Sequence, residues 1–331
     1  MKFFRYFILL LTILILGACG KKEEPTQKTL PTLNVMLEWY PNAFHSFVYV
    51  GMEKGFYKDA GLNINILLPS NTTDPLALTA AGKADVGFYY MHDVILKRTK
   101  ENIPVKSIGA LLQKSTNVII SPKDKNITGP QDLAHKKIGY SGDEYTEQVV
   151  KSLAKKNNID PNSIEMVDVG FDLLTSMITN RVDGTIGCVV NHEVPVMEEK
   201  NIPINYFAPT DFGLPEYYGT VFVSSDETIK NKGPLLKKFL VASKRAFEYT
   251  KAHPEEAIDI ILKNQQEESF PLNKNVETKS LEMLIPLMET PKAPFLSENK
   301  EVWEKNIQWL YEENMIPKKL PPEDFFVNLE N

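Results

Sequence analysis

The chain has 331 residues, of which 43% are hydrophobic and 24% are charged, and its formal net charge at pH 7 is −6. An acidic balance provides no basic surface for a nucleic acid, so nucleic-acid binding is excluded. Its two cysteines, Cys19 and Cys188, exclude a disulfide framework and a CxxC metal site. Stability must therefore come from a large hydrophobic core, and the length predicts two lobes rather than one.

The N-terminus resembles a bacterial lipoprotein signal. Lys2 and Arg5 precede an apolar stretch, residues 7–16, that is too short to span a bilayer comfortably. The stretch ends in Leu-Gly-Ala-Cys (16–19), which looks like a lipobox. We expect residues 1–18 to be removed and Cys19 to carry lipid, which places the protein on the extracytoplasmic face of the cell membrane. An uncleaved anchor helix or an ordinary secretory signal is the alternative.

Residues 19–31 are predicted to form a flexible tether, because CGKKEEPTQKTLP is polar, contains proline and lacks periodicity. From residue 33 onward, short apolar strands alternate with helical patterns. Strands are predicted at 33–37, 62–69, 85–90 and 105–112, with helices at 46–61, 74–84 and 92–102. This βαβ alternation is typical of a parallel sheet covered by helices on both faces.

The same alternation then restarts. Strands are predicted at 117–122, 136–142, 164–170 and 183–190, and helices at 129–135, 144–157, 171–181 and 193–200. A third block begins near residue 220 and becomes helical at 234–253, 254–263 and 301–313. The pattern predicts an α/β protein with two lobes, lobe 1 from residues 32–116 and 221–331 and lobe 2 from residues 117–220.

Candidate ligand residues follow the strands, because ligands of open α/β sheets bind beyond the carboxyl ends of the strands. These loops contain aromatic rings, amides and carboxylates but almost no cationic side chain, which favours a flat, neutral heterocycle over an anion. Structural roles are the alternative: Trp39 and Phe44 as core, Glu193 as a helix-start acid, and Ser141 with Glu144 as a capping box. The candidates are Trp39, Asn42, His45, Asn71, Tyr89, Tyr90, Tyr145, Asn191 and Glu193.

A long segment, VMLEWYPNAFHSFVYVGMEKGFYKDAGLNINILLPSNTTDPLALTAAGKADVGF (35–88), resembles the thiamine-pyrimidine-precursor group of type II periplasmic binding proteins. The resemblance continues through DLAHKKIGYSG (132–142), RVDGTIGC (181–188) and VPVMEEKNIPI (194–204). The KGFYKDAGL string is typical of the wider superfamily of binding proteins. The WYPNAFH string and the Asn-His-Glu at 191–193 are more specific to the thiamine-pyrimidine-precursor group. The resemblance covers nearly all of residues 33–260.

This resemblance implies two α/β lobes that are joined by a hinge and close on a ligand in the cleft between them. Trp39 and an aromatic partner would stack on the two faces of an aminopyrimidine, either formylaminopyrimidine or hydroxymethylpyrimidine. Asn42 and Glu193 would form hydrogen bonds with its ring nitrogens and exocyclic amine. Tyr89 and Tyr90 would also line the cleft. The implied partners are an ABC permease and its cytoplasmic ATPase, since this chain has no P-loop. We expect a monomer without cofactor, metal or catalytic residues.

The resembled family also contains a eukaryotic thiamine-pyrimidine synthase, so an enzyme is one alternative. The substrate-bearing lysine of that synthase would align with Tyr89 and its reactive histidine with Asp93, one residue beyond His92. Its cysteine-rich iron-binding segment would fall on residues 214–219, which contain no cysteine. Two further alternatives are the same fold binding a riboflavin-like, sulfonate, taurine or nitrate ligand, and a lipoprotein that binds no small molecule.

Overall fold

The computed structural model describes residues 30–170 and 172–329. The predicted signal peptide, Cys19 and nearly all of the predicted tether lie outside these residues. Within the described residues, no helix combines the length and the apolar character that crossing a membrane requires.

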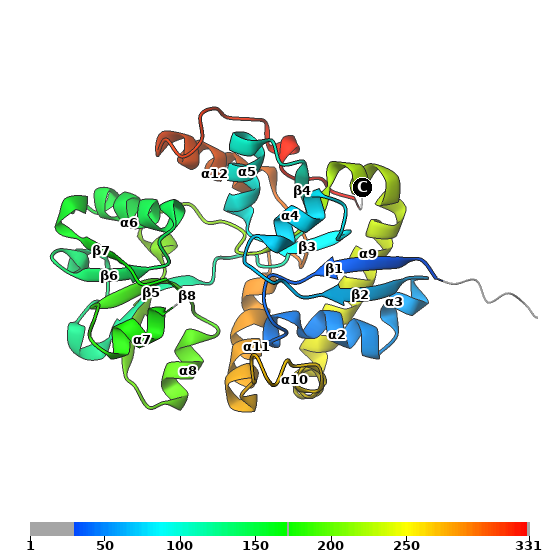
Figure 1. Cartoon of the computed structure of the whole chain (residues 1–331), viewed down its shortest axis with the longest axis horizontal. Coiled ribbons are helices and arrows are strands. Elements are labelled where there is room, and N and C mark those ends of the chain that lie inside the picture. The colour runs from blue at the N-terminus through cyan, green and yellow to red at the C-terminus, as the bar shows by residue number, and fades with distance from the viewer. Residues whose placement is uncertain (1–29, 171, 330–331) are drawn as a thin grey trace, which may run out of the picture. The chain divides into compact units, whose positions relative to one another are not determined.

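The first sheet has five strands in the order β2-β1-β3-β10-β4 (Figure 1). Strand β1 (Thr32–Met36) pairs in parallel with β2 (Asn63–Leu67) and with β3 (Val86–Tyr89). Strand β10 (Val221–Ser225) runs antiparallel between β3 and β4 (Val105–Ala110). We refer to this sheet and the helices that cover it as lobe 1.

The second sheet also has five strands, in the order β7-β6-β8-β5-β9. Strands β6 (Lys137–Tyr140), β7 (Glu165–Asp168) and β8 (Gly184–Val189) are parallel. Strand β5 (Asn117–Pro122) runs antiparallel between β8 and β9 (Ile204–Phe207). We refer to this sheet and its helices as lobe 2.

Both sheets are mixed: each contains the parallel strands that the βαβ alternation predicted, together with one strand that runs against them. The antiparallel strands, β5 and β10, are the first strands that form after the chain crosses from one sheet to the other. A strand that enters a sheet from the neighbouring lobe arrives at the edge where the parallel strands end, and therefore runs against them. The two crossings lie side by side, because the amides of Leu111 and Leu112 both donate to the carbonyl of Thr220 at 2.9 and 3.1 Å.

Helices cover both faces of each sheet, and the alternation of side chains along the strands explains how. In β10, Phe222 points into one core with Phe47 and Phe239, whereas Val221 and Val223 point into another. The helices of lobe 1 are α2 (Ser46–Glu53), α3 (Phe56–Asp59), α4 (Asp74–Ala80), α5 (Met91–Glu101), α9 (Asp226–Ala252), α10 (Pro254–Lys263), α11 (Lys274–Met288) and α12 (Lys300–Glu312). Those of lobe 2 are α6 (Glu144–Lys156), α7 (Leu173–Ile178) and α8 (Glu193–Glu199).

Most predicted elements are present, with local differences that have physical causes. The single helix predicted at 46–61 is divided into α2 and α3 at Gly55, which adopts a positive φ of 75°. Helix α9 begins at Asp226, capped by Ser225, and contains Pro234, where the sequence had placed its start. Helix α6 is capped by Asp143, which accepts from the amide of Thr146, so the Ser141 capping box was wrong. Strand β9 and helix α11 were not predicted.

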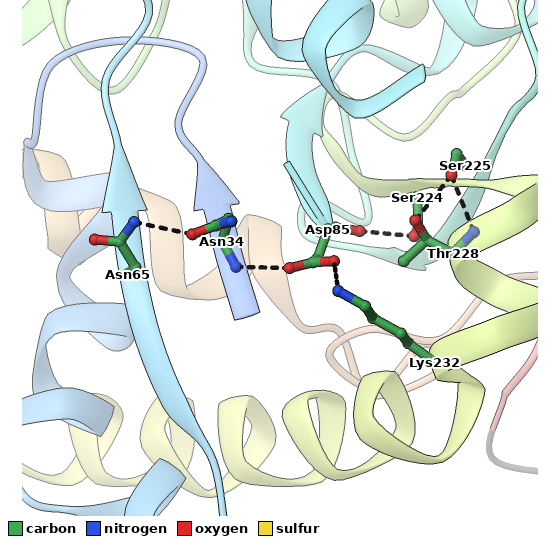
Figure 2. A network of polar contacts seen from close by, with 7 residues as sticks. All are labelled: Asn34, Asn65, Asp85, Ser224, Ser225, Thr228 and Lys232. Carbon is green, nitrogen blue, oxygen red and sulfur yellow. Dashed lines mark hydrogen bonds and ion pairs between the residues drawn. The ribbon is translucent and has the colours of Figure 1, made fainter. Parts of the chain in front are cut away.

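A buried carboxylate fixes the strands of lobe 1 near the start of β3. Asp85 Oδ2 accepts from the Asn34 amide at 2.9 Å, and Oδ1 pairs with Lys232 Nζ at 2.6 Å. Ser224 Oγ donates to the Asp85 carbonyl at 2.7 Å, and Asn34 Oδ1 accepts from Asn65 Nδ2 at 2.9 Å. Figure 2 shows this network, formed by Asn34, Asn65, Asp85, Ser224, Ser225, Thr228 and Lys232. It ties together strands whose opposite ends lead to the functional site.

A second acidic group in lobe 1 makes the stability of the fold depend on pH. Glu298, between α11 and α12, has a buried Oε1 without a hydrogen-bond partner among the described residues. Burial raises the pKa of the Glu298 carboxyl to about 8, although the Ser107 and Trp303 side chains act to lower it. The folded protein therefore holds this proton at pH values where the unfolded chain has lost it.

We predict that Glu298→Gln stabilises the protein at alkaline pH. Wild-type stability should fall as the pH rises from about 4.5 to about 8, by up to about 1.4 kcal/mol per pH unit, because folding must retain a proton that the unfolded chain releases. The glutamine variant should lack this decline. Thermal unfolding between pH 5 and pH 9 measures the difference, and parallel curves for the two proteins would contradict the prediction.

Candidate functional site

A cavity of about 330 Å³ lies between the two lobes, at the carboxyl ends of β1, β3 and β8. Both lobes and both crossing segments contribute to its wall. Its size is within the range of small-molecule sites. The lining residues are Glu38, Trp39, Asn42, Phe44, Tyr90, Leu112, Thr116, Asn117, Val189, Asn191, His192, Glu193, Gly219, Thr220, Phe270, Glu277, Ser280 and Leu284.

The loop after β1 forms one wall, and a buried histidine holds it in shape. Asn42 caps the short helix Ala43–His45, its Oδ1 accepting from the Phe44 amide at 2.9 Å. The backbone amide of Asn42 in turn donates to His45 Nδ1 at 3.3 Å. With Nδ1 as acceptor, the ring proton lies on Nε2 and is donated to Glu38 Oε2 at 3.0 Å. His45 is fully buried and therefore positions Glu38 and Asn42 from behind the cavity wall.

Aromatic rings form the most open part of the wall. Trp39 is 39% exposed and meets Phe270 edge-on, with ring centroids 6.1 Å apart. Phe270 lies between α10 and α11 and stacks on Tyr40 at 5.7 Å and on His192 at 6.2 Å. Phe270 thus brings a ring from the C-terminal part of lobe 1 beside Trp39 and His192, and a flat molecule entering here would meet several ring surfaces.

The start of α8 forms the facing wall in lobe 2. Glu193 Oε2 accepts from the Val189 amide at 2.6 Å, and Oε1 lies 3.0 Å from His192 Nδ1. These contacts fix the carboxylate at the first turn of a helix, where a negative charge is also favourable. Asn191 crosses to the other lobe, since its Nδ2 donates to Ser280 Oγ of α11 at 3.1 Å in a buried contact.

Helix α11 completes the cavity with three residues of one face. Glu277, Ser280 and Leu284 have the i, i+3, i+7 spacing of a single helical face, and all three line the cavity. Glu277 is 2% exposed, and its Oε2 accepts from the Ala43 amide at 2.7 Å. Burial raises the pKa of Glu277, while the hydrogen bond from the Ala43 amide and the charge of His192 act to lower it.

The cavity is acidic. Three of its lining residues are glutamates, Glu38, Glu193 and Glu277, and none is lysine or arginine. The one lining residue that can become cationic is His192. Burial lowers the pKa of His192, but the hydrogen bond to Glu193 and the charges of Glu193 and Glu277 outweigh burial, so the pKa is raised overall. Among the described residues, no group of three histidine, cysteine or acidic side chains could hold a metal ion.

The structure brings together five of the nine residues predicted for the ligand site, namely Trp39, Asn42, Tyr90, Asn191 and Glu193. The other four do not line this cavity. His45 lies behind it, and Tyr89 is buried in the core on the other face of the sheet. Asn71 lies in an exposed loop, where its Oδ1 accepts from the amides of Thr73 and Asp74.

Tyr145 belongs to a separate cluster between the lobes. Its hydroxyl lies 2.6 Å from Nδ1 of His92, and His92 Nε2 lies 2.8 Å from Asn306 Oδ1. Burial lowers the pKa of His92 to about 4, so the ring is neutral, donates to Asn306 and accepts from Tyr145. Tyr217 accepts from Asn117 Nδ2 at 2.9 Å in the same cluster. The cavity there is only about 40 Å³, far smaller than the cavity of about 330 Å³ between the lobes.

Several lining residues were missed from the sequence, above all Phe270, Glu277 and Ser280. Phe270 is an isolated aromatic in the polar segment QQEESFPLN (265–273). Glu277 and Ser280 interrupt the apolar face of α11. A polar pair on the buried side of a helix was the available signal, because buried acids need a partner or a function.

The model of the family described as NMT1/THI5 like matches residues 42–257. The chain belongs to this family. A formylaminopyrimidine-binding protein of Halalkalibacterium halodurans is 36% identical to it over 329 residues, 99% of each chain. A 4-amino-5-hydroxymethyl-2-methylpyrimidine phosphate synthase of Legionella pneumophila is 27% identical over 252 residues, 75% of this chain and 78% of the synthase.

Solved structures of this fold include the periplasmic aliphatic sulphonate binding protein SsuA of Escherichia coli. It matches with a TM-score of 0.70 at 14% identity, covering 88% of this chain and 96% of SsuA. The two-lobe type II periplasmic-binding-protein fold, predicted from the resemblance, is confirmed.

The rim of the cavity in this NMT1/THI5-like protein carries polar contacts between the lobes. Helix α8 of lobe 2 and helix α11 of lobe 1 both reach from the cavity to the surface. Lys279 Nζ pairs with Glu198 Oε2 at 2.9 Å, and Asn275 Nδ2 donates to Glu199 Oε1 at 3.3 Å. These exposed contacts form only when the lobes are close, so they favour the closed arrangement without lining the cavity.

We predict that Lys279→Glu shifts the protein toward an open arrangement. The variant places like charges on α8 and α11, and their repulsion is screened by salt. Small-angle X-ray scattering of the truncated chain from residue 32 should show a larger radius of gyration at low salt, recovered in 1 M NaCl or by adding Glu198→Lys. Lys274→Glu is the matched control, because Lys274 pairs with Asp259 inside lobe 1. Equal radii for both variants at low salt would contradict the prediction.

Proposed function

We propose that this protein is the solute-binding lipoprotein of an ABC importer. In this function it captures a thiamine pyrimidine precursor, formylaminopyrimidine or hydroxymethylpyrimidine, and delivers it to a permease driven by a cytoplasmic ATPase. Residues 32–116 and 221–331 would act as lobe 1 and residues 117–220 as lobe 2. Lipid on Cys19 would hold the monomer at the outer face of the membrane, with residues 19–31 as its tether.

The observation that carries this proposal is the composition of the cavity. Trp39, Phe270 and Tyr90 supply ring surface, and Asn42 and Glu193 supply polar edges, while lysine and arginine are absent from the lining residues. This set suits a flat neutral heterocycle that carries N–H donors. The 36% identity to a formylaminopyrimidine-binding protein across the whole chain supports the same ligand class.

Binding would favour closure because the ligand contacts both lobes. Trp39 and Asn42 belong to lobe 1, and Glu193 belongs to lobe 2. A ligand that reaches all three gains its full contact energy only when the lobes are close, and it therefore raises the population of the closed form. The Val189 amide and the His192 ring hold the Glu193 carboxylate in place. Its side chain therefore loses little conformational entropy when the ligand binds.

The proposal is binding without turnover. Tyr89, which by resemblance would align with the substrate-bearing lysine of the synthase, is a buried phenol outside the cavity. Residues 214–219, Leu-Pro-Glu-Tyr-Tyr-Gly, offer no thiolate for iron. We therefore infer that the relationship to the synthases reflects a shared binding site for the pyrimidine rather than shared chemistry.

We predict that the truncated chain from residue 32 is stabilised by formylaminopyrimidine or hydroxymethylpyrimidine. Its thermal midpoint should rise by mass action, whereas riboflavin, taurine and nitrate should leave it unchanged. A thermal-shift panel with these five compounds makes the measurement. A shift with taurine or nitrate and none with either pyrimidine would overturn the proposed ligand class.

We further predict that Glu193→Gln weakens pyrimidine binding by about 10- to 100-fold, because a charge-assisted hydrogen bond contributes about 1.5–3 kcal/mol. The amide oxygen can still accept from the Val189 amide, so the fold should persist. Glu165→Gln, an exposed change in the same lobe, is the control. Isothermal titration calorimetry measures both affinities. Unaltered binding by the Glu193 variant would show that this carboxylate does not contact the ligand.

A further inference from the structure

Glu277 is a carboxylate in the cavity wall that the proposed contacts of Trp39, Asn42 and Glu193 leave unused. It comes from α11, far along the chain from these residues, and is 2% exposed. Lysine and arginine are absent from the lining of the cavity, so no such side chain offsets its charge there. Keeping a carboxylate in this position is costly unless it has a partner or a function.

The two oxygens of Glu277 have different surroundings. Oε2 accepts from the Ala43 amide at 2.7 Å, which fixes the direction of the carboxyl group. The described residues provide no hydrogen bond to Oε1, and this oxygen is not among the fully buried atoms that lack a partner. Since Glu277 lines the cavity, Oε1 is the oxygen that a bound molecule can reach.

Glu277 and Glu193 belong to opposite walls. Glu277 is part of lobe 1 and Glu193 begins α8 of lobe 2, and the charges of both act on the pKa of His192. Beside them, the Asn191–Ser280 contact joins the lobes. A ligand with N–H or O–H donors at two ends could therefore donate to one carboxylate in each lobe.

We propose that Glu277 is a specificity residue: its Oε1 accepts a hydrogen bond from the substituent at the far end of the pyrimidine, and its charge, together with Glu38 and Glu193, excludes phosphorylated pyrimidines. The inference rests on the proposed function and deepens it. A formylamino group offers an N–H and a hydroxymethyl group an O–H, and both are neutral. A phosphate ester replaces that donor with negative charge, which three nearby carboxylates repel.

The proposal separates this protein from the synthase relatives in one respect. Those enzymes are named as synthases of 4-amino-5-hydroxymethyl-2-methylpyrimidine phosphate. The cavity lacks lysine and arginine and holds three glutamates, and its one potential cation, His192, is already paired with Glu193. The protein would therefore bind the unphosphorylated pyrimidine and reject its phosphate ester.

Isothermal titration calorimetry of the chain from residue 32 tests this inference with three probes: formylaminopyrimidine, 4-amino-5-hydroxymethyl-2-methylpyrimidine and its phosphate ester. The wild-type protein should bind the phosphate ester at least about 100-fold more weakly than the alcohol. Glu277→Gln keeps an acceptor for the Ala43 amide but turns an NH₂ group toward the cavity. This variant should bind formylaminopyrimidine about tenfold or more less tightly than the wild type. The ratio of its affinities for the alcohol and the phosphate ester should be smaller than in the wild type by about fivefold or more.

Two further variants make the result decisive. Glu277→Asp keeps the charge but shortens the side chain. The variant should therefore bind the two neutral ligands more weakly than the wild type and should still reject the phosphate ester. Glu282→Gln removes the same charge from an exposed position of α11 and should behave as wild type. If Glu277→Gln keeps wild-type affinities and preference, the inference is wrong while the proposed function stands. If the wild-type protein binds none of the three probes, the proposed function fails and this inference with it.

Discussion

The chain passes between its two sheets twice, and this constraint determines where a ligand can bind. The crossing segments hydrogen-bond to each other through Leu111, Leu112 and Thr220, and residues of both segments line the cavity. Each crossing also delivers one antiparallel strand, β5 or β10, into the sheet that it enters. The floor of the cavity is thus the same structure that joins the lobes, so a change in the lobe arrangement must change the cavity.

The walls on either side of this floor are held by local contacts within each lobe. In lobe 1 the ring of His45 joins Glu38 to the backbone amide of Asn42, and in lobe 2 the first turn of α8 holds Glu193. These groups are arranged before any ligand arrives. The contacts that join the lobes beside the cavity are one buried amide–hydroxyl bond and exposed polar pairs at the rim, while Tyr145 and His92 join the lobes away from it. Rigid walls joined by weaker contacts allow closure to respond to occupancy.

The sequence predicted the fold class and the order of most elements, because strand and helix patterns are strong where one face is apolar. Prediction from the sequence failed where residues of the candidate site interrupt the hydrophobic pattern of an element. Helix α11 was missed because Glu277 and Ser280 occupy its buried face, and Phe270 was missed because it lies in a polar loop between helices. Tyr145 and Asn71 follow strands as ligand residues do, yet one packs on His92 and the other caps a turn. Position after a strand indicates the correct edge of a sheet but not the direction of a side chain.

The three tryptophans differ sharply in their surroundings. Trp303 and Trp309 are buried at 0% and 6% exposure, whereas Trp39 is 39% exposed on the cavity wall. Their intrinsic fluorescence should consequently divide into a blue emission from two enclosed indoles and a redder emission from one indole in contact with solvent. Any molecule that covers Trp39 would alter only the redder part, so the protein carries a native optical reporter of cavity occupancy that needs no label.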